Sequence, residues 1–341
     1  MNNGILTTPL DERKKFPIKA AFANTLIAIQ EKYNNIVVFD ADLQACSGTK
    51  PFQEKFPKRH FNVGVAEQNM VGIAAGLSLS GKLVPFASSF ACFLAKRAGD
   101  QMDISVGLNQ SNVKICGDYC CLTTATNGPS HGSLGDVAFA QTIPEMVILS
   151  PADTVELEKM MWAMVEHQGP VYLRKPKGEM TQIFTEDYKF KIGKAVELTE
   201  GNDAAIISYG AMVWQCLLAA ELLRKKGVKA KVINMSTIKP WDREIVYRLA
   251  ERVGWIVVVE NHNIISGLGS EIGTWLMEAG QCRCRFKRLG VPDQYQPAAS
   301  FEYLLDYFEL SPKHIAQAVE KLLGFPPRDL RIAREVAQMM D

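Results

Sequence analysis

The sequence predicts an α/β protein built from two domains, each with a mainly parallel sheet. Short β-rich apolar runs alternate with helical patterns of roughly ten to fifteen residues, which is typical of parallel strands joined by crossover helices. The length of 341 residues also exceeds what one hydrophobic core usually serves. A polar, irregular stretch near residues 175–203 interrupts the pattern and divides the chain into two parts.

The order of the elements follows from these patterns. We expect the first domain at residues 1–180, a linker at 181–202, the second domain at 203–325 and a tail at 326–341. Strands are predicted at 35–40, 82–87, 112–116, 146–149 and 171–173, and then at 204–209, 230–234, 255–260 and 284–289. Helical patterns lie at 67–79, 154–166, 213–226 and 270–278. Continuous apolar strands such as 255–259 indicate sheets covered on both faces.

Composition and charge exclude several classes of protein. The 38 basic and 37 acidic side chains leave a formal net charge of +1, so no nucleic-acid partner is expected. No apolar run reaches the roughly 18 residues that cross a bilayer, and the first residues do not resemble a signal peptide. We therefore expect a cytoplasmic protein without a membrane partner. The eight cysteines form no paired C-x-x-C clusters, which favours buried free thiols over a zinc site.

Common nucleotide and hydrolase motifs are missing from the sequence. It contains neither a phosphate-binding G-x-x-x-x-G-K-[ST] loop nor a G-x-S-x-G elbow. Gly267, Gly269 and Gly273 follow a predicted strand, but the last glycine is one residue late for a dinucleotide loop. We interpret this segment as a tight strand-to-helix turn.

A carboxylate stands at the head of an apolar, glycine-rich helix. Glu67 begins this helix, and Gly72 and Gly76 lie on it at positions that permit close packing, for example at a subunit interface. No lysine or arginine lies near Glu67 in the sequence, so its carboxylate is costly to bury unless it titrates upward. The alternative is that Glu67 caps the helix in solvent, where acids are favoured.

Two further segments carry candidate site residues. Phe90 and Phe93 are a pair of aromatics three residues apart, a pattern that by itself is more often core than a cofactor platform. A polar loop at 117–132 follows a predicted strand, which is where open α/β sheets bind their ligands. His131 in this loop is a candidate substrate contact.

Together these motifs resemble the pyrimidine-binding domain of transketolases. The matching segments are G-V-A-E-Q-N-M at 64–70, F-A-C-F at 90–93, R-A-G-D-Q at 97–101, N-G-P-S-H at 127–131 and S-P-A-D at 150–153. Pieces at 40–43 and 238–242 match as well, and the resemblance extends in order from residue 14 to residue 323. The chain is similar to the carboxyl-terminal half of a transketolase made as a separate subunit. The resemblance implies a pyrimidine-binding domain followed by a transketolase C-terminal domain.

The resemblance also implies a thiamine diphosphate enzyme that transfers two-carbon ketol groups between sugars. Glu67 matches the glutamate that hydrogen-bonds N1′ of the aminopyrimidine, and Phe90 and Phe93 match the aromatics that pack against this ring. The family binds the diphosphate through a metal on a G-D-G motif, which this sequence lacks. A Mg²⁺ or Ca²⁺ site is therefore expected on an N-terminal-type partner subunit, with no metal held by this chain. The expected assembly is α₂β₂, with this chain forming half an active site.

Departures from the family pattern concern the sugar. Where the family has a histidine, an aspartate, an arginine and a serine, this chain has Tyr119, Asn127, Lys19 and Cys46. His131 and Arg174 are retained, and the resemblance implies that they contact the distal, usually phosphorylated, end of a sugar. These differences predict an atypical anionic or branched sugar substrate.

Two alternatives remain open at this point. The β subunit of a 2-oxo acid dehydrogenase shares the layout and the cofactor, although the segments at 128–131 and 150–153 favour transketolase. A non-catalytic, partner-stabilising subunit is the second alternative, motivated by the changes at Tyr119 and Asn127.

Overall fold

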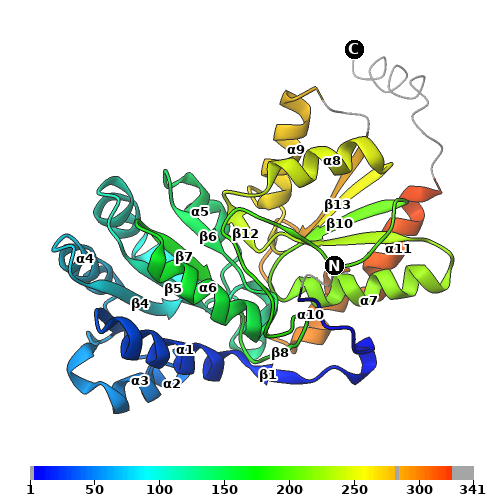
Figure 1. The fold of residues 1–341 in the computed structure, drawn as a ribbon. Coiled ribbons are helices and arrows are strands. Elements are labelled where there is room, and N and C mark those ends of the chain that lie inside the picture. Colours follow the sequence, from blue (N-terminus) through cyan, green and yellow to red (C-terminus); the bar gives the residue numbers. More distant parts are fainter. Residues whose placement is uncertain (1–3, 281–283, 325–341) are drawn as a thin grey trace.

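The computed structural model describes residues 4–280 and 284–324, and it places two sheets side by side (Figure 1). The predicted tail at 326–341 lies outside the described residues. The first sheet has the order β12-β6-β7-β5-β4-β2-β3 and is parallel except for β12. Its strands are β2 (Ile36–Asp40), β3 (His60–Asn62), β4 (Val84–Phe90), β5 (Lys114–Asp118), β6 (Val147–Leu149), β7 (Val171–Arg174) and β12 (Thr237–Lys239).

Alternating side chains of the central strands build a core on each face of this sheet. In β2, Ile36 and Val38 pack on one face, whereas Val37 and Phe39 pack on the other. The first face is covered by α1 (Ile18–Tyr33) and α6 (Thr154–Glu166), and the second by α4 (Glu67–Ser78) and the π-helical segment η4 (Gln101–Leu108). The α/β architecture predicted from the sequence is confirmed.

The second sheet has the order β14-β13-β10-β11-β9, and only β9 is antiparallel. Its strands are β9 (Val196–Glu197), β10 (Ala204–Ser208), β11 (Ala230–Asn234), β13 (Trp255–Asn263) and β14 (Arg285–Val291). One face is covered by α7 (Met212–Lys225) and α11 (Pro312–Leu323), and the other by α8 (Arg243–Arg252) and α9 (Leu268–Glu278).

The strand β12 joins the two sheets in a way that the sequence did not indicate. It follows β11 of the second sheet, yet it pairs antiparallel with β6 at the edge of the first sheet. One hydrophobic core then runs from the first sheet through Ile238 to the second sheet. The two halves of the chain are therefore packed together and are not separated by an open linker.

The remaining elements are short. A two-stranded antiparallel sheet pairs β1 (Lys15–Pro17) with β8 (Glu179–Thr181). The other segments are α2 (Gln44–Ser47), α3 (Lys50–Lys55), α5 (Asp136–Thr142) and α10 (Phe301–Tyr307), with η1 (Leu10–Glu12), η2 (Pro57–Arg59), η3 (Phe93–Arg97) and η5 (Cys121–Asn127). Within the described ranges, no helix combines the length and the apolar character needed to cross a membrane. Among the described cysteines, Cys46, Cys92, Cys116, Cys120, Cys121 and Cys216 are free thiols, and all of these but Cys46 are buried.

Candidate active site

The predicted site residues gather at the carboxyl ends of the strands of the first sheet. β4 ends at Phe90, and β5 ends at Asp118, directly before the polar loop that holds His131. Glu67 begins α4 just beyond β3. Because parallel strands present their carboxyl ends at one edge, residues far apart in sequence meet there.

Glu67 is fully buried, and its carboxylate has two side-chain partners. Ser89 Oγ donates a hydrogen bond to Oε1 at 3.0 Å, and Nη1 of Arg97 lies 2.7 Å from Oε2. The expectation that no basic residue stands near Glu67 is therefore wrong. Arg97 lies thirty residues away in the sequence, and only the fold brings the two together.

A π-helical turn explains how Arg97 reaches Glu67. The segment η3 (Phe93–Arg97) ends with a hydrogen bond from the Ala98 amide to the Phe93 carbonyl, five residues back. The wider π turn sets Phe93 and Arg97 at its two ends, with the Arg97 guanidinium 4.4 Å from the centre of the Phe93 ring. This turn therefore supplies both an aromatic face and the cation for Glu67.

An aromatic cluster extends from Glu67 toward the loop. The ring of Phe90 stacks on Tyr119 at 4.4 Å and on Phe93 at 5.6 Å between ring centres. The His131 ring meets Phe90 and Phe93 edge-on at 5.8 and 5.5 Å. Ser130 Oγ lies 2.8 Å from His131 Nδ1 and fixes this end of the imidazole. Phe90, Phe93, Tyr119 and His131 form one continuous group, which we call the aromatic cluster.

Tyr119, Cys46 and Lys19 are three of the positions at which this chain departs from the family pattern. Burial and a hydrogen bond with Cys46 raise the pKa of Tyr119, so its hydroxyl stays protonated. Cys46 is half-buried in α2. Lys19 is exposed near the start of α1, and its backbone carbonyl borders Gly48, directly after α2. Tyr119 thus contacts Cys46, and the backbone of Lys19 lies beside the end of the short helix that holds Cys46.

Lys177 is a cation that our reading of the sequence missed. Its Nζ donates a 2.6 Å hydrogen bond to Oδ1 of the exposed Asn127. The same Nζ lies 4.9 Å from the centre of the Tyr119 ring. The fifty residues that separate Lys177 from Asn127 leave no local signal, apart from the basic run K-P-K at 175–177.

Arg174, which the resemblance places at the distal end of the sugar, is enclosed between the two domains. Its side chain is 1% exposed, its Nε lies 2.6 Å from Oδ2 of Asp136, and its Nη2 donates to the carbonyl of Asn261. Tyr172 also donates to Asp136. This ion pair lowers the pKa of Asp136 although burial opposes the change. Arg174 thus joins the domains, and its contact with the sugar stays a prediction.

A second buried ion pair lies beneath the loop. Nζ of Lys175 lies 3.0 Å from Oδ1 of Asp118 and also donates to the carbonyl of Ser47. Burial raises the pKa of Asp118 to about 6, and the charge of Lys175 opposes that rise. This pair ties the end of β5 to the segment that holds Cys46.

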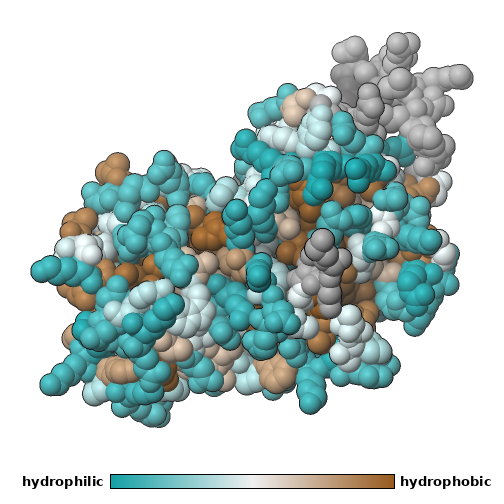
Figure 2. Space-filling view, in the orientation of Figure 1, coloured by the Kyte–Doolittle hydropathy of each residue, from teal (hydrophilic) through white to brown (hydrophobic). Residues whose placement is uncertain are grey.

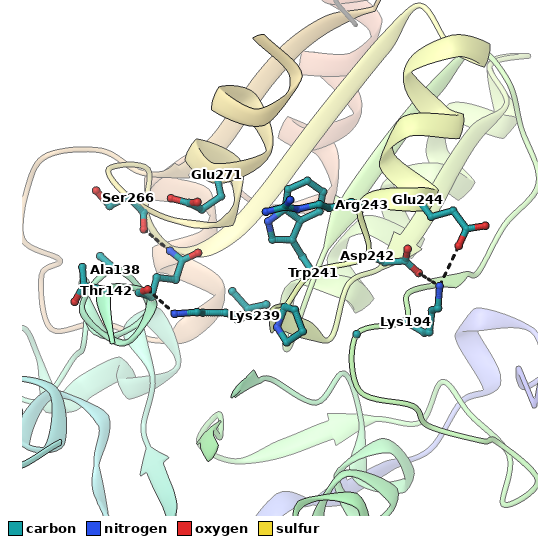
Figure 3. A pocket seen from close by; sticks show the side chains of 14 residues that line it. Ala138, Thr142, Lys194, Lys239, Trp241, Asp242, Arg243, Glu244, Ser266 and Glu271 are labelled. Atoms are coloured by element: carbon teal, nitrogen blue, oxygen red, sulfur yellow. Dashed lines mark hydrogen bonds and ion pairs between the residues drawn. The ribbon is translucent and has the colours of Figure 1, made fainter. Parts of the chain in front are cut away.

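One hollow in the structure is lined by a predicted site residue, whereas another is not. One, of about 610 Å³, is lined by Phe93, Arg97, Lys96 and Tyr295 and opens beside the aromatic cluster. The other, of about 690 Å³, lies between the domains and is lined by Lys194, Trp241, Arg243 and Glu271 among others (Figure 3). None of the predicted site residues lines it, and its Lys194 is already paired with Asp242 and Glu244. The first hollow is the candidate active site.

The backbone amides of the glycine-rich turn at 267–273 bind a carboxylate of the same domain. The amides of Leu268 and Gly269 donate to the carboxylate of Glu260, each at 2.8 Å. A Cβ on Gly267 would lie 2.5 Å from that carboxylate. The helix terminus thus binds a side chain of its own domain, in agreement with a simple strand-to-helix turn. Over residues 4–280 and 284–324, no group of three or more potential ligands is placed to hold a metal ion.

Comparison with protein families decides the identity of the fold. The pyrimidine-binding domain of transketolase matches residues 14–182, and the transketolase C-terminal domain matches residues 193–315. The chain belongs to the transketolase family. This family is of the thiamine diphosphate-dependent type.

The individual relatives include a transketolase subunit and a putative transketolase section. The chain is 38% identical over 305 residues to the 6-deoxy-6-sulfo-D-fructose transketolase subunit SqwH of Clostridium sp. (strain MSTE9), covering 89% of this chain and 94% of the relative. It is 37% identical over 304 residues to a putative transketolase C-terminal section of Methanocaldococcus jannaschii, with coverage of 89% and 95%. A solved split-gene transketolase, described as an inactive β4 tetramer, superposes with a TM-score of 0.83 at 33% identity and covers 92% of this chain and 100% of its own. The chain is therefore a split transketolase-type subunit.

Proposed function

We propose that the chain is the pyrimidine-side subunit of a transketolase that moves a two-carbon ketol unit from an anionic ketose to an aldose. The observation that carries this proposal is the buried Glu67 carboxylate at the base of the aromatic cluster, beside an open hollow. The family models are those of transketolase, which favours this reaction over oxidation of a 2-oxo acid.

The residues around the hollow fit the aminopyrimidine part of thiamine diphosphate. A flat aromatic ring needs an apolar face and a polar group at its edge, and Phe93 and Glu67 offer these two features. Phe93 is half-buried, so part of its ring faces the hollow. When bound, thiamine diphosphate supplies a carbon nucleophile that attacks the carbonyl of the ketose.

Glu67 has the role of sharing a proton with N1′ of the aminopyrimidine. A hydrogen bond between this carboxyl and N1′ would favour the imino form of the bound ring, which would make the C2 carbon available as the nucleophile. Ser89 and Arg97 hold the carboxyl group in place from the protein side. Phe90 and Phe93 pack against one face of the aminopyrimidine ring.

The sugar is proposed to lie against the loop that follows β5. His131, Asn127 and Tyr119 are its contacts, with Lys19 and Cys46 toward the distal end. Lys177 adds a positive charge beside Asn127, which suits an anionic tail. The relative from Clostridium is named for a sulfonated fructose, and this supports an anionic ketose that is not an ordinary sugar phosphate.

The proposed partner is an N-terminal transketolase-type subunit that holds Mg²⁺ or Ca²⁺ and the diphosphate. The lack of a G-D-G motif in the sequence supports this division. A solved relative described as a tetramer of β chains is inactive, which agrees with a need for the second subunit. We propose an α₂β₂ complex.

An exposed apolar surface next to Glu67 is the proposed docking site for the partner. α4 begins at Glu67, and the helix leaves Gly72 and Gly76 open, since a Cβ on either meets nothing within 4 Å. Figure 2 shows hydrophobic side chains over the part of the molecule where Figure 1 places α4. The surface, which we call the α4 surface, comprises Val65, Gly72, Ile73, Gly76, Leu79, Ile104 and Leu108. Contiguous exposed apolar groups mark interaction sites.

Cofactor binding with and without a partner tests the proposal. We expect calorimetry to show micromolar, Mg²⁺-dependent binding of thiamine diphosphate only when the partner that carries the G-D-G motif, here called the G-D-G subunit, is present. The complex should then transfer ketol units from fructose 6-phosphate or 6-deoxy-6-sulfo-D-fructose. Tight binding by this chain alone would overturn the division into subunits, and turnover of a branched 2-oxo acid instead of a ketose would overturn the reaction.

A further inference from the structure

The loop between Tyr119 and His131 has an unusually strained backbone. Tyr119, Cys121 and Ala125 have φ values of 57°, 44° and 54°, although none of them is glycine. Such left-handed conformations are uncommon for residues with a side chain, and they persist only where neighbouring structure holds them. The loop therefore needs an external support.

That support comes from the second domain, through the side chain of Asn261. The Leu122 amide donates to Asn261 Oδ1 at 2.9 Å, and Asn261 Nδ2 donates to the carbonyl of Cys120 at 3.3 Å. Asn261 is 2% exposed and lies near the end of β13. One buried amide group thus satisfies a backbone donor and a backbone acceptor on either side of Cys121.

A second side chain of the same domain holds the next carbonyl. Gln296 Nε2 donates to the carbonyl of Cys121 at 3.3 Å, and Gln296 is also buried. The loop lies so close that a Cβ on Gly132 would stand 2.6 Å from Gln296, and a Cβ on Gly128 would stand 3.3 Å from Ala298. The second domain therefore fits tightly against both ends of the strained segment.

Asn261 itself is anchored to the first domain. Its carbonyl accepts a 2.8 Å hydrogen bond from Nη2 of Arg174, whose Nε pairs with Asp136. The buried Arg174–Asp136 pair thereby fixes the end of β13 relative to β7. This interdomain contact holds the backbone of Asn261, from which its side chain reaches the loop.

We infer that Asn261 and Gln296 are positioning residues, through which the second domain holds the loop in the conformation that presents Tyr119, Asn127 and His131 to the sugar. This inference rests on the proposed function. Glu67 is held separately by Ser89 and Arg97, both of the first sheet and its π-helical turn. Loss of the Asn261 contacts should therefore impair sugar handling without impairing activation of the cofactor.

The test compares Asn261→Ala and Gln296→Ala with Asn234→Ala. Asn234 is a suitable control because it is also a buried asparagine at the end of a strand of the second sheet, but its Nδ2 donates to Glu156 of α6. Hydrogen exchange of residues 119–132 is followed by mass spectrometry in the whole chain. The complex with the G-D-G subunit is assayed for deuterium exchange at thiazolium C2, and for kcat and KM with the better of fructose 6-phosphate and 6-deoxy-6-sulfo-D-fructose.

We expect exchange of the 119–132 amides to rise about tenfold or more in Asn261→Ala and Gln296→Ala, and not in Asn234→Ala. The ratio kcat/KM should fall about tenfold or more, while C2 exchange stays within about twofold of the wild type. Unchanged loop exchange and sugar kinetics in both variants, with normal C2 exchange, would overturn the inference. A wild-type complex that fails to exchange C2 would instead overturn the proposed function, and the loop exchange would still decide whether Asn261 holds the loop.

Discussion

Nη1 of Arg97 lies 2.7 Å from Oε2 of Glu67, so the last residue of a π-helical turn is paired with the first residue of α4. The Glu67 side chain is 1% exposed and that of Arg97 is 42% exposed. The pair thus has a buried acid and a solvent-facing base. The carboxylate can stay in an apolar setting while its cation remains hydrated.

Glu67→Gln should abolish most of the activation of the cofactor. Glutamine keeps the shape and can still form a hydrogen bond, but it cannot exchange the proton. Loss of a positioned acid–base group costs about 10²–10⁴-fold in rate. Deuterium exchange at thiazolium C2 in the assembled complex measures this step, with Glu271→Gln in the interdomain hollow as the matched control. Wild-type exchange in the Glu67→Gln complex would reduce Glu67 to a helix-end residue.

Arg97→Leu should destabilise the isolated chain, because it leaves a buried carboxylate without its cation. Breaking a buried pair costs about 3–5 kcal/mol, and the exposure of Arg97 to solvent reduces the expected loss to about 1–3 kcal/mol. Urea unfolding gives this free energy directly. Arg97→Lys should recover most of the loss, since it restores a charge in reach of Glu67. Equal stability of Arg97→Leu and wild type would show that the pair contributes nothing.

Glu156 should make stability depend on pH. Burial raises its pKa to about 7, while its carboxylate accepts from Ala152, Tyr188 and Asn234. Between the unfolded pKa near 4.5 and the folded pKa near 7, the native state keeps a proton that the unfolded state has lost. The free energy of unfolding therefore falls as pH rises through this range and levels off above it.

Glu156→Gln removes this titration. The amide changes the free energy of unfolding by an amount that does not depend on pH. Relative to the wild type, the free energy of unfolding of the variant should therefore rise by up to about 3 kcal/mol between pH 5 and pH 8. Urea unfolding of both proteins at a series of pH values measures the difference. Parallel stability curves for the two proteins would contradict the raised pKa.

Gly72→Leu should block assembly while leaving the chain folded. The position is open in this chain, and replacing a helical glycine stabilises a helix by about 0.5–1 kcal/mol. A bulky side chain on the α4 surface would, however, separate the two subunits. We expect affinity for the partner, measured by calorimetry, to fall at least about tenfold. Gly254→Leu, at an exposed position in the second domain, is the control. Undiminished affinity would place the partner elsewhere.

Asn127→Asp should shift the choice of sugar toward ordinary ketose phosphates. An aspartate would still accept the hydrogen bond from Lys177. Because its carboxylate is charged, it would be a stronger hydrogen-bond acceptor for a hydroxyl of the donor sugar than the amide oxygen of asparagine is. The ratio of kcat/KM for fructose 6-phosphate to that for 6-deoxy-6-sulfo-D-fructose should rise. An unchanged ratio would remove Asn127 from the determinants of specificity.

The sequence by itself determined the strands and helices that have a clear local pattern. The apolar run at 35–40 became β2 (Ile36–Asp40), and the helix predicted at 154–166 became α6 (Thr154–Glu166). Phe90 and Phe93 are only three residues apart, at the end of β4 and the start of η3, and their rings stack at 5.6 Å. These features depend on neighbours in the sequence, which is why composition and spacing could predict them.

Only the tertiary structure decided the pairings between distant segments. β12 was not predicted, because a three-residue strand has no pattern of its own and its partner β6 lies far away in the sequence. The same reason explains why Arg97 beside Glu67 and Lys177 beside Asn127 were missed. The same holds for the ion pair of Arg174 with Asp136, because Asp136 is supplied by α5. Local sequence sets which elements form, and the energy of burying charged side chains sets which of them must meet.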